Sequence, residues 1–199
     1  VTMLSKLQNP ALPNLDYKPL NEMLDFKAGE NLRSIEIDIY DDTEVEPNEY
    51  IDLKLVDFSD GVQGNQSNSS LEIISDDSVL SFSASRYSVS ESIKGGFARI
   101  NINRLGSTIG DSTVSFITAT NGTAQAVLDF QMISNTIEFL DGEITKSVNV
   151  PIVDDILVEP EETVVLLLTN VLGRSILGIS ESELSIIDND FAPGQFYFE

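Results

Sequence analysis

The chain has 199 residues, of which 33 are acidic and 11 basic, and its formal net charge is −22. This charge disfavours nucleic acid and anionic membrane surfaces as partners and favours cations, while a hydrophobic content of 41% is enough for a folded core. The absence of cysteine and histidine excludes disulfides, thiolate chemistry, the commonest zinc ligands and nucleophiles of the Ser-His or Cys-His type.

The ends and the hydropathy of the chain say little about its compartment. No apolar stretch approaches the length of a membrane span, and the N-terminus has no signal-peptide pattern. Because the sequence begins with Val1 rather than Met, we expect it to be an internal piece of a longer protein. Lack of cysteine does not exclude the cell exterior, where calcium can stabilise a domain in place of disulfides.

The first part of the chain predicts strands separated by polar turns. Residues 9–18 form a proline-rich loop, and residues 59–70, rich in Gly, Asn and Ser, form a surface loop. An acidic loop that contains Pro47 interrupts the pattern, since proline cannot donate to a strand ladder. We expect strands over 1–8, 23–27, 32–40, 50–58 and 70–75.

The second part begins after almost no linker, because only Asp76, Asp77 and Ser78 separate one strand from the next. Seven strands with turns at short intervals follow in about 110 residues, and no helical period is sustained, which is typical of an immunoglobulin-like β-sandwich. We expect these strands over 79–83 continued by 87–91, then 97–103, 113–118, 130–133 with 136–139, 145–153, 163–171 and 183–187.

An acidic loop with a central proline occurs once in each part of the chain. Each residue of the first loop lies 113 positions before its counterpart, as Asp41 and Asp154 illustrate, and the correspondence extends over the flanking strands, so a whole domain is repeated. Carboxylates at this density repel one another, and a bound cation offsets the repulsion. A single loop of this kind is better explained as solvated surface, but its repetition favours a function. The carboxylates are Asp41, Asp42, Glu46 and Glu49 in the first loop and Asp154, Asp155, Glu159, Glu161 and Glu162 in the second.

Strand direction predicts that distant carboxylates meet at one end of the second sandwich. If successive strands are antiparallel, Glu91, Asp129, the 154–162 loop and the 188–190 segment share one pole. Ca²⁺ takes six to eight oxygen ligands and suits such a set, whereas Mg²⁺ requires rigid octahedral geometry and accepts few protein ligands. The sequence therefore predicts a calcium site, with room for more than one ion.

Several short motifs of the second domain occur together, and as a set they resemble the Calx-β domain, the calcium-binding module of sodium–calcium exchangers that also forms arrays in extracellular matrix and adhesion proteins. The resemblance covers Val79–Asp190 in full and Val1–Asp77 as the later part of a preceding copy. The motifs are Ser-Val-Ser-Glu-Ser at 88–92, Gly-Thr-Ala at 122–124, Leu-Asp-Phe at 128–130, Phe139 with Gly142-Glu143, Val-Asp-Asp at 153–155, Glu-Pro-Glu-Glu at 159–162 and Ile-Asp-Asn-Asp at 187–190.

The resemblance implies an all-β chain of tandem immunoglobulin-like antiparallel sandwiches. Residues 1–77 would be a first domain without its first strands, 78–190 a complete domain, and 191–199 the start of a following domain or a linker strand. The incomplete first domain would expose a sheet edge, which either reflects truncation or is completed by another chain.

The resemblance also implies the ligands of Ca²⁺ by position. Ser75 stands where the second domain has Asp188, and the strand that would supply a glutamate precedes Val1, so the second site is expected to be the stronger one. The alternative is a copy of the fold that has lost its calcium. The implied ligands are Glu91, Asp129, Asp154, Asp155, Glu159, Glu162, Asp188, Asp190 and the carbonyl of Leu157 in the second domain, and Asp16, Asp41, Asp42, Glu46, Glu49, Asp76 and Asp77 in the first.

Two functions of different class follow from this. The first is a calcium-dependent structural or adhesion module of a cell-surface or extracellular matrix protein, stiffened by Ca²⁺ near the junction of its domains. Its partners would be neighbouring repeats, other copies through an exposed sheet edge, or protein and glycan adhesion partners. The second is a pair of regulatory calcium sensors in an exchanger-like transporter. An enzyme such as an acidic glycosidase is disfavoured, because the chain has no tryptophan platform and no histidine.

Overall fold

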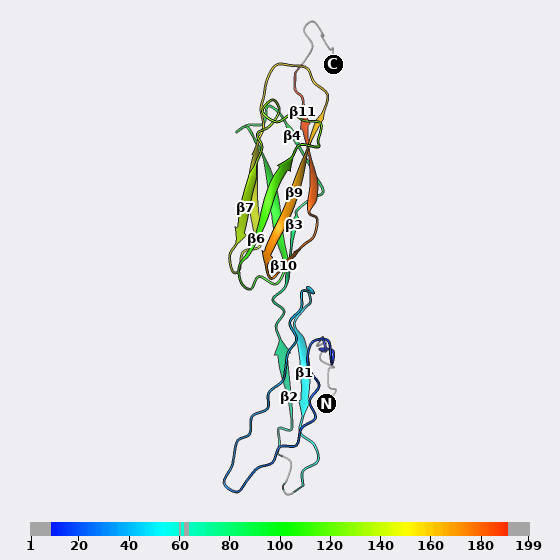
Figure 1. Cartoon of the computed structure of the whole chain (residues 1–199), viewed down its shortest axis with the longest axis vertical. Coiled ribbons are helices and arrows are strands. Elements are labelled where there is room, and N and C mark those ends of the chain that lie inside the picture. Colours follow the sequence, from blue (N-terminus) through cyan, green and yellow to red (C-terminus); the bar gives the residue numbers. More distant parts are fainter. Residues whose placement is uncertain (1–8, 60, 62–63, 191–199) are drawn as a thin grey trace. The chain divides into compact units, whose positions relative to one another are not determined.

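The structure of the protein, a computed structural model, describes residues 9–59, 61 and 64–190 (Figure 1). Every regular element in these residues is a β-strand, so the all-β prediction is confirmed. The chain divides into two compact units, Val1–Ser75 (unit 1) and Asp76–Glu199 (unit 2). The strand expected over residues 1–8 and the tail at 191–199 lie outside the described residues.

Unit 2 is a sandwich of two sheets. One sheet has the strand order β10-β3-β5-β8 and the other β4-β11-β9-β6-β7. Alternate residues of β6 and β9 are buried, which is the period of strands with one face toward a core. The strands are β3 (Ser78–Phe82), β4 (Arg86–Ser90), β5 (Phe97–Gly106), β6 (Ser112–Ala119), β7 (Ser134–Phe139), β8 (Thr145–Pro151), β9 (Glu162–Gly173), β10 (Ser175–Leu177) and β11 (Glu181–Ile187).

The core of unit 2 lies between the two sheets. Ile100 and Val150 come from one sheet and Phe116 and Leu166 from the other, and all four are fully buried. Burying each such side chain stabilises the fold by roughly 1.5–3 kcal/mol. The predicted sandwich is therefore confirmed, and its rigid strands position the loops at its ends.

The strand expected over 79–83 and 87–91 is divided between the two sheets. β3 pairs antiparallel with β5, whereas β4 pairs parallel with β11 in the other sheet, and a bend at residues 83–85 separates them. The strand expected over 183–187 forms as β11 beside β4, and a short strand that was not predicted, β10, lies beside β3 in the other sheet. As a result, β4 lies at one edge of its sheet and β7 at the other.

Unit 1 has two strands among its described residues, β1 (Glu49–Lys54) and β2 (Asn68–Ile73), which pair antiparallel. The strands expected over 23–27 and 32–40 do not form. Their counterparts 113 residues later are β7 and β8, which pair with β6 and β5. The described part of unit 1 contains no equivalent of β5 or β6, so these segments have no ladder to join.

Unit 1 consequently leaves its apolar side chains exposed. Phe26 is 52% exposed, whereas Phe139, its counterpart in unit 2, is fully buried. Ile39 is also exposed, and its counterpart Ile152 is buried. Among the described residues of unit 1, only Ala11 and Ile51 have buried hydrophobic side chains, and the incomplete first domain remains a prediction.

Candidate metal centre

The strand register brings several loops to one pole of unit 2. β4 and β11 are parallel and pair Ser90 with Ile187, so the residues that follow both strands leave the sandwich at the same end. β9 is antiparallel to β11, and it therefore begins at this end with Glu162. β6 also ends here, since Ala119 pairs with Val165 near the start of β9.

Two groups of three carboxylates lie at this pole. The residues of each group offer one carboxylate oxygen apiece, and these oxygens lie within 4.8 Å of one another. We call them the exit cluster (Glu91, Asp188 and Asp190) and the loop cluster (Asp129, Glu159 and Glu162). Both groups consist entirely of residues that the sequence predicted as ligands.

The exit cluster contains buried oxygens that lack a partner. Glu91 is only 6% exposed, and neither its Oε1 nor Oδ2 of Asp190 has a hydrogen-bond partner among the described residues. Burial, together with the charges of Asp188 and Asp190, raises the pKa of Glu91 to about 7. Asp188 behaves in the opposite way, because the backbone N–H groups of Asp190 and Glu159 donate to it and lower its pKa.

The loop cluster is built on a strained turn. Val127 has a φ of 80°, and its N–H donates to the carbonyl of Phe130 over 2.7 Å. Asp129 lies inside this turn and accepts a hydrogen bond of 2.5 Å from the N–H of Gln125. Burial, and next the neighbouring Asp129, raise the pKa of Glu162. The turn therefore fixes Asp129 beside the first residue of β9.

The two clusters form one site, which we call the acidic pole. The N–H of Glu159 donates to Oδ2 of Asp188 over 2.9 Å, which joins the loop cluster to the exit cluster. The pKa of Glu159 is raised by burial and then by Asp129, Asp155 and Asp188. Carboxylates whose charge is not compensated have raised pKa values, and their buried oxygens lack partners. A hard cation would lower these pKa values and coordinate the oxygens. The donor set therefore fits Ca²⁺.

Three further residues predicted as ligands in unit 2 lie outside the two clusters. Asp155 is half-buried, accepts a hydrogen bond of 2.7 Å from the N–H of Leu157, and is close enough to affect the pKa of Glu159. Asp154 and Leu157 are exposed. A role for these three in binding an ion remains a prediction.

Sequence reasoning had missed that Asn189 connects two segments of the acidic pole. Its Oδ1 accepts a hydrogen bond of 3.0 Å from the N–H of Ser92, which links the turn after β4 to the exit of β11. Spacing gives no sign of this contact, because the two residues are far apart in the sequence and meet only through the parallel pairing of β4 with β11.

Unit 1 contains a copy of the loop cluster. Carboxylate oxygens of Asp16, Glu46 and Glu49 lie within 4.8 Å of one another, and these residues stand 113 positions before the members of the loop cluster. The bridge of Tyr17 with Ile39 likewise repeats that of Phe130 with Ile152 in unit 2. Burial, and next its contact with Asp16, raise the pKa of Glu49.

Four other residues predicted as ligands of the first domain lie elsewhere. Asp41 and Asp42 are exposed, and Asp42 accepts from the N–H of Glu44 in the way that Asp155 accepts from Leu157. Asp76 and Asp77 belong to unit 2, where Asp76 forms an ion pair of 2.9 Å with Arg174 and Asp77 is buried. Their role as calcium ligands also remains a prediction.

The model of the Calx-beta domain family matches residues 8–78 and 74–190. The chain belongs to the Calx-beta domain family. The two matched segments overlap only at residues 74–78, so the chain carries Calx-beta sequence in tandem. No helix in the described residues has the length and apolar character needed to cross a membrane.

Two much longer proteins are similar in sequence to the chain. The chain is 29% identical over 203 residues to adhesion G-protein coupled receptor V1 of Danio rerio, a match that covers 92% of the chain and 3% of the receptor. It is 32% identical over 176 residues to extracellular matrix protein 3 of Lytechinus variegatus, covering 81% of the chain and 6% of that protein. The chain therefore spans only a small fraction of these relatives.

Solved Calx-beta structures share the fold. The crystal structure of the apo form of the Calx CBD1 domain has a TM-score of 0.54 and 23% identity, with 58% of the chain and all of that domain covered. The crystal structure of the calcium binding domain CBD12 of CALX1.1 has a TM-score of 0.53 and 24% identity, with 56% of the chain and 44% of that structure covered.

Proposed function

We propose that the chain is a calcium-binding structural module, a tandem of Calx-beta repeats in a cell-surface or extracellular matrix protein. The observation that carries this proposal is the pair of buried carboxylate oxygens without partners, Oε1 of Glu91 and Oδ2 of Asp190. A buried charge without a partner is costly, and a bound cation would turn that cost into stabilisation.

Calcium suits the acidic pole better than magnesium. Six carboxylates in two linked clusters offer many oxygens, and Ca²⁺ accepts six to eight oxygens at about 2.3–2.6 Å in flexible geometry. Mg²⁺ holds its waters and needs near-ideal octahedral geometry at about 2.0–2.1 Å. Two clusters joined by the bond from Glu159 to Asp188 favour more than one Ca²⁺ per complete domain.

Bound calcium would stiffen the array. The carboxylates of the two clusters come from four segments: the end of β4, the turn before Phe130, the 154–162 loop and the exit of β11. An ion bound by them would add to the hydrogen bonds that already join these segments. The exit cluster lies immediately before residue 191, at the end of one repeat. An ion there would restrict the chain where it enters whatever follows.

The relatives support a place outside the cell. Their names identify an adhesion receptor and an extracellular matrix protein, and both are far longer than this chain. We infer that the repeats act by binding and spacing, without catalysis, at the cell surface or in the matrix. The regulatory-sensor alternative predicts a calcium-driven change of conformation rather than stiffening, which hydrogen exchange can separate.

Thermal unfolding of the chain tests calcium binding. Ligand that binds only the folded state adds about 2.7 kcal/mol at a hundredfold excess over Kd, so millimolar Ca²⁺ should raise the midpoint by several degrees relative to excess chelator. Mg²⁺ should have little effect, and Glu162→Gln should remove most of the rise. Glu138→Gln, an exposed glutamate of β7, is the matched control. Equal midpoints with Ca²⁺ and with chelator would contradict calcium binding.

Hydrogen exchange tests stiffening in the same samples. Amides of residues 153–161 and 188–190 should exchange more slowly with Ca²⁺ than with chelator, while the centres of β5 and β9 should not change. If calcium raised the unfolding midpoint but did not slow exchange in these segments, calcium binding would be supported and the stiffening role would be refuted. Altered exchange spread over both sheets would instead favour the regulatory sensor.

A further inference from the structure

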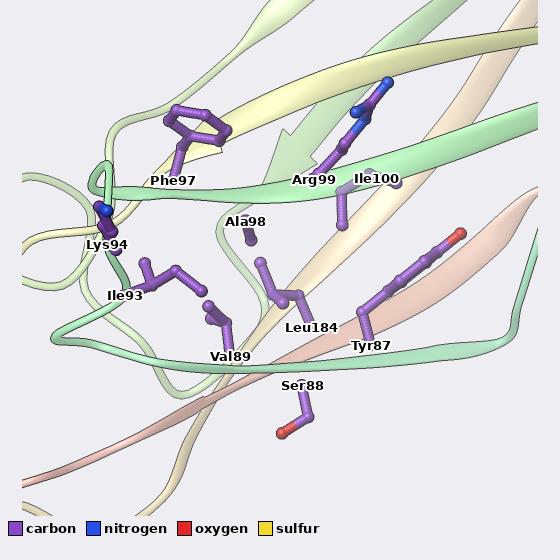
Figure 2. Close-up of a pocket in the computed structure, with 10 residues that line it drawn as sticks. All are labelled: Tyr87, Ser88, Val89, Ile93, Lys94, Phe97, Ala98, Arg99, Ile100 and Leu184. Carbon is purple, nitrogen blue, oxygen red and sulfur yellow. The ribbon is translucent and has the colours of Figure 1, made fainter.

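A groove runs between β4 and β5 in unit 2, beside the bend where the chain passes from β3 to β4. It has a volume of about 300 Å³ (Figure 2). Figure 2 shows Val89, Ile93, Ala98 and Leu184 pointing into the space between the two strands, so the groove has an apolar floor. Phe97 and Arg99 project from the opposite side of β5 and form its rim.

Two strand edges that lack a neighbour border this groove. Within the part of the chain that the structure describes, β4 pairs only with β11, so no described strand covers its other edge. β5 pairs with β3 only from Ile102 onward, and the last backbone bond on that side runs from the N–H of Ser83 to the carbonyl of Asn101 over 3.0 Å. The first residues of β5 therefore have a partner strand only on the β8 side.

The hydrogen-bonding pattern between β5 and β8 shows which backbone groups of β5 face the groove. The N–H of Ile152 donates to the carbonyl of Gly96, and alternate residues of an antiparallel strand bond to the same neighbour. Ala98 and Ile100 thus bond toward β8, which leaves the N–H and carbonyl of Arg99 directed toward the groove. Among the described residues no hydrogen bond on this side involves Arg99.

The charges at the rim are also free. Unit 2 has six basic residues in its described part, and four of them bind acceptors: Arg86, Arg104, Lys146 and Arg174. The other two, Lys94 and Arg99, have no ion pair or hydrogen bond from their side chains within the described residues, and both line this groove. In so acidic a chain, a local pair of unneutralised cations favours an acidic partner.

We propose that this groove binds an extended acidic peptide segment of another protein by strand addition to β5. The segment lies antiparallel to β5, in line with β3, and its backbone bonds to the N–H and carbonyl of Arg99. Alternate side chains enter the apolar floor, and carboxylates on the other face meet Lys94 and Arg99. Main-chain bonds supply affinity in this mode, and the pockets and charges supply specificity. The proposal does not depend on calcium.

Fluorescence anisotropy with two seven-residue peptides tests this binding. In one peptide valine alternates with glutamate, and in the other lysine replaces glutamate. The full chain is used in excess chelator, so the calcium site plays no part. The net charge of −22 would by itself favour the lysine peptide. We expect the glutamate peptide to bind instead, and Arg99→Glu or Lys94→Glu to weaken it about tenfold.

Two controls separate strand addition from general attraction. Lys146→Glu makes the same change of charge on β8, away from the groove, and should leave binding unchanged. Two further versions of the glutamate peptide carry methyl groups on alternate backbone nitrogens, either on the edge that faces β5 or on the opposite edge. The first version should not bind, and the second should bind normally. Stronger binding of the lysine peptide, no binding, or equal loss in all three variants would overturn the proposal. A dimer of the chain that Arg99→Glu dissociates would replace the peptide with a second copy and also overturn it.

Discussion

Glu159 donates its backbone N–H to Oδ2 of Asp188 over 2.9 Å, and this bond joins the two carboxylate clusters of unit 2. A second N–H, from Asp190, donates to Oδ1 of the same carboxylate. Asp188 is therefore stabilised in its ionised form, with a lowered pKa, while Glu91 beside it is buried with a pKa of about 7. Without an ion, the acidic pole must hold protons near neutral pH.

This proton uptake predicts an inverted pH dependence of stability in chelator. Glu91 and Glu162 have raised pKa values in the folded state, whereas an unfolded glutamate has a pKa of about 4.3. Between these values the folded state binds more protons, so the free energy of unfolding should fall as pH rises from about 5 to about 7.5 and then level off. Urea unfolding at a series of pH values with excess chelator measures it.

Calcium should reverse this trend. Protons compete with Ca²⁺ for the same carboxylates, so the gain in unfolding free energy from saturating calcium should increase over the same pH range. Stability that rises with pH in chelator would show that these glutamates are ionised without difficulty in the folded state, and the uncompensated charge at the acidic pole would be refuted.

Glu91→Gln should change stability in opposite directions with and without calcium. The amide removes a buried carboxylate whose Oε1 has no partner, so the midpoint in chelator at pH 7.5 should rise or stay constant. The same change deletes a ligand, so the rise caused by millimolar Ca²⁺ should shrink strongly. Differential scanning calorimetry in both conditions measures the two effects.

The matched control for this variant is Glu181→Gln. Glu181 is exposed and lies at the start of β11, the opposite end of the strand from Asp188. It should change the free energy of unfolding by less than about 0.5 kcal/mol in both conditions. A fall in the chelator midpoint of Glu91→Gln, equal to its fall in calcium, would mean that Glu91 has a purely structural role.

Val127→Asn should stabilise the turn that holds Asp129. Val127 has a φ of 80°, which is unfavourable for a β-branched residue, and its side chain is 79% exposed, so little packing is lost. Asn14 stands at the matched position of unit 1 with a φ of 67°, a conformation that asparagine tolerates. We expect a gain of about 1 kcal/mol in the free energy of unfolding in chelator.

Val158→Asn is the control, because Val158 is also exposed but does not have a positive φ. It should change the free energy of unfolding by less than about 0.5 kcal/mol. If both variants gave the same change, relief of backbone strain would not be the cause.

The sequence predicted the sandwich and the acidic pole because both follow from short-range patterns. Alternating burial of β6 and β9 can be read from Val114–Thr118 and Val164–Leu168, and strand direction alone brings Glu91 and Asp188 to one end. The 113-residue repeat also predicted the trio of Asp16, Glu46 and Glu49.

What the sequence could not predict depends on partners distant in the chain. The division between β3 and β4 follows from pairing with two different strands, β5 and β11, and its local sequence shows only a bend. Residues 32–40 have a good strand pattern and still form no strand, because pairing requires a neighbour that the described part of unit 1 lacks. The same limit applies to the contact of Asn189 with Ser92.

Substitutions at corresponding positions of the two repeats test whether unit 1 lacks the core that unit 2 has. Phe139 is fully buried in unit 2, and Phe26, at the corresponding position of unit 1, is 52% exposed. Phe139→Ala should cost about 3–5 kcal/mol of unfolding free energy, since it leaves a cavity between the sheets. Phe26→Ala should cost less than about 0.5 kcal/mol, as expected for a surface site.

Circular dichroism during urea unfolding, with hydrogen exchange to assign each transition to its unit, measures both changes. A large loss for Phe26→Ala would mean that this side chain packs against a partner in solution, which would be direct support for completion of unit 1 by another chain. Equal small losses for both variants would instead contradict the buried core of unit 2 at Phe139.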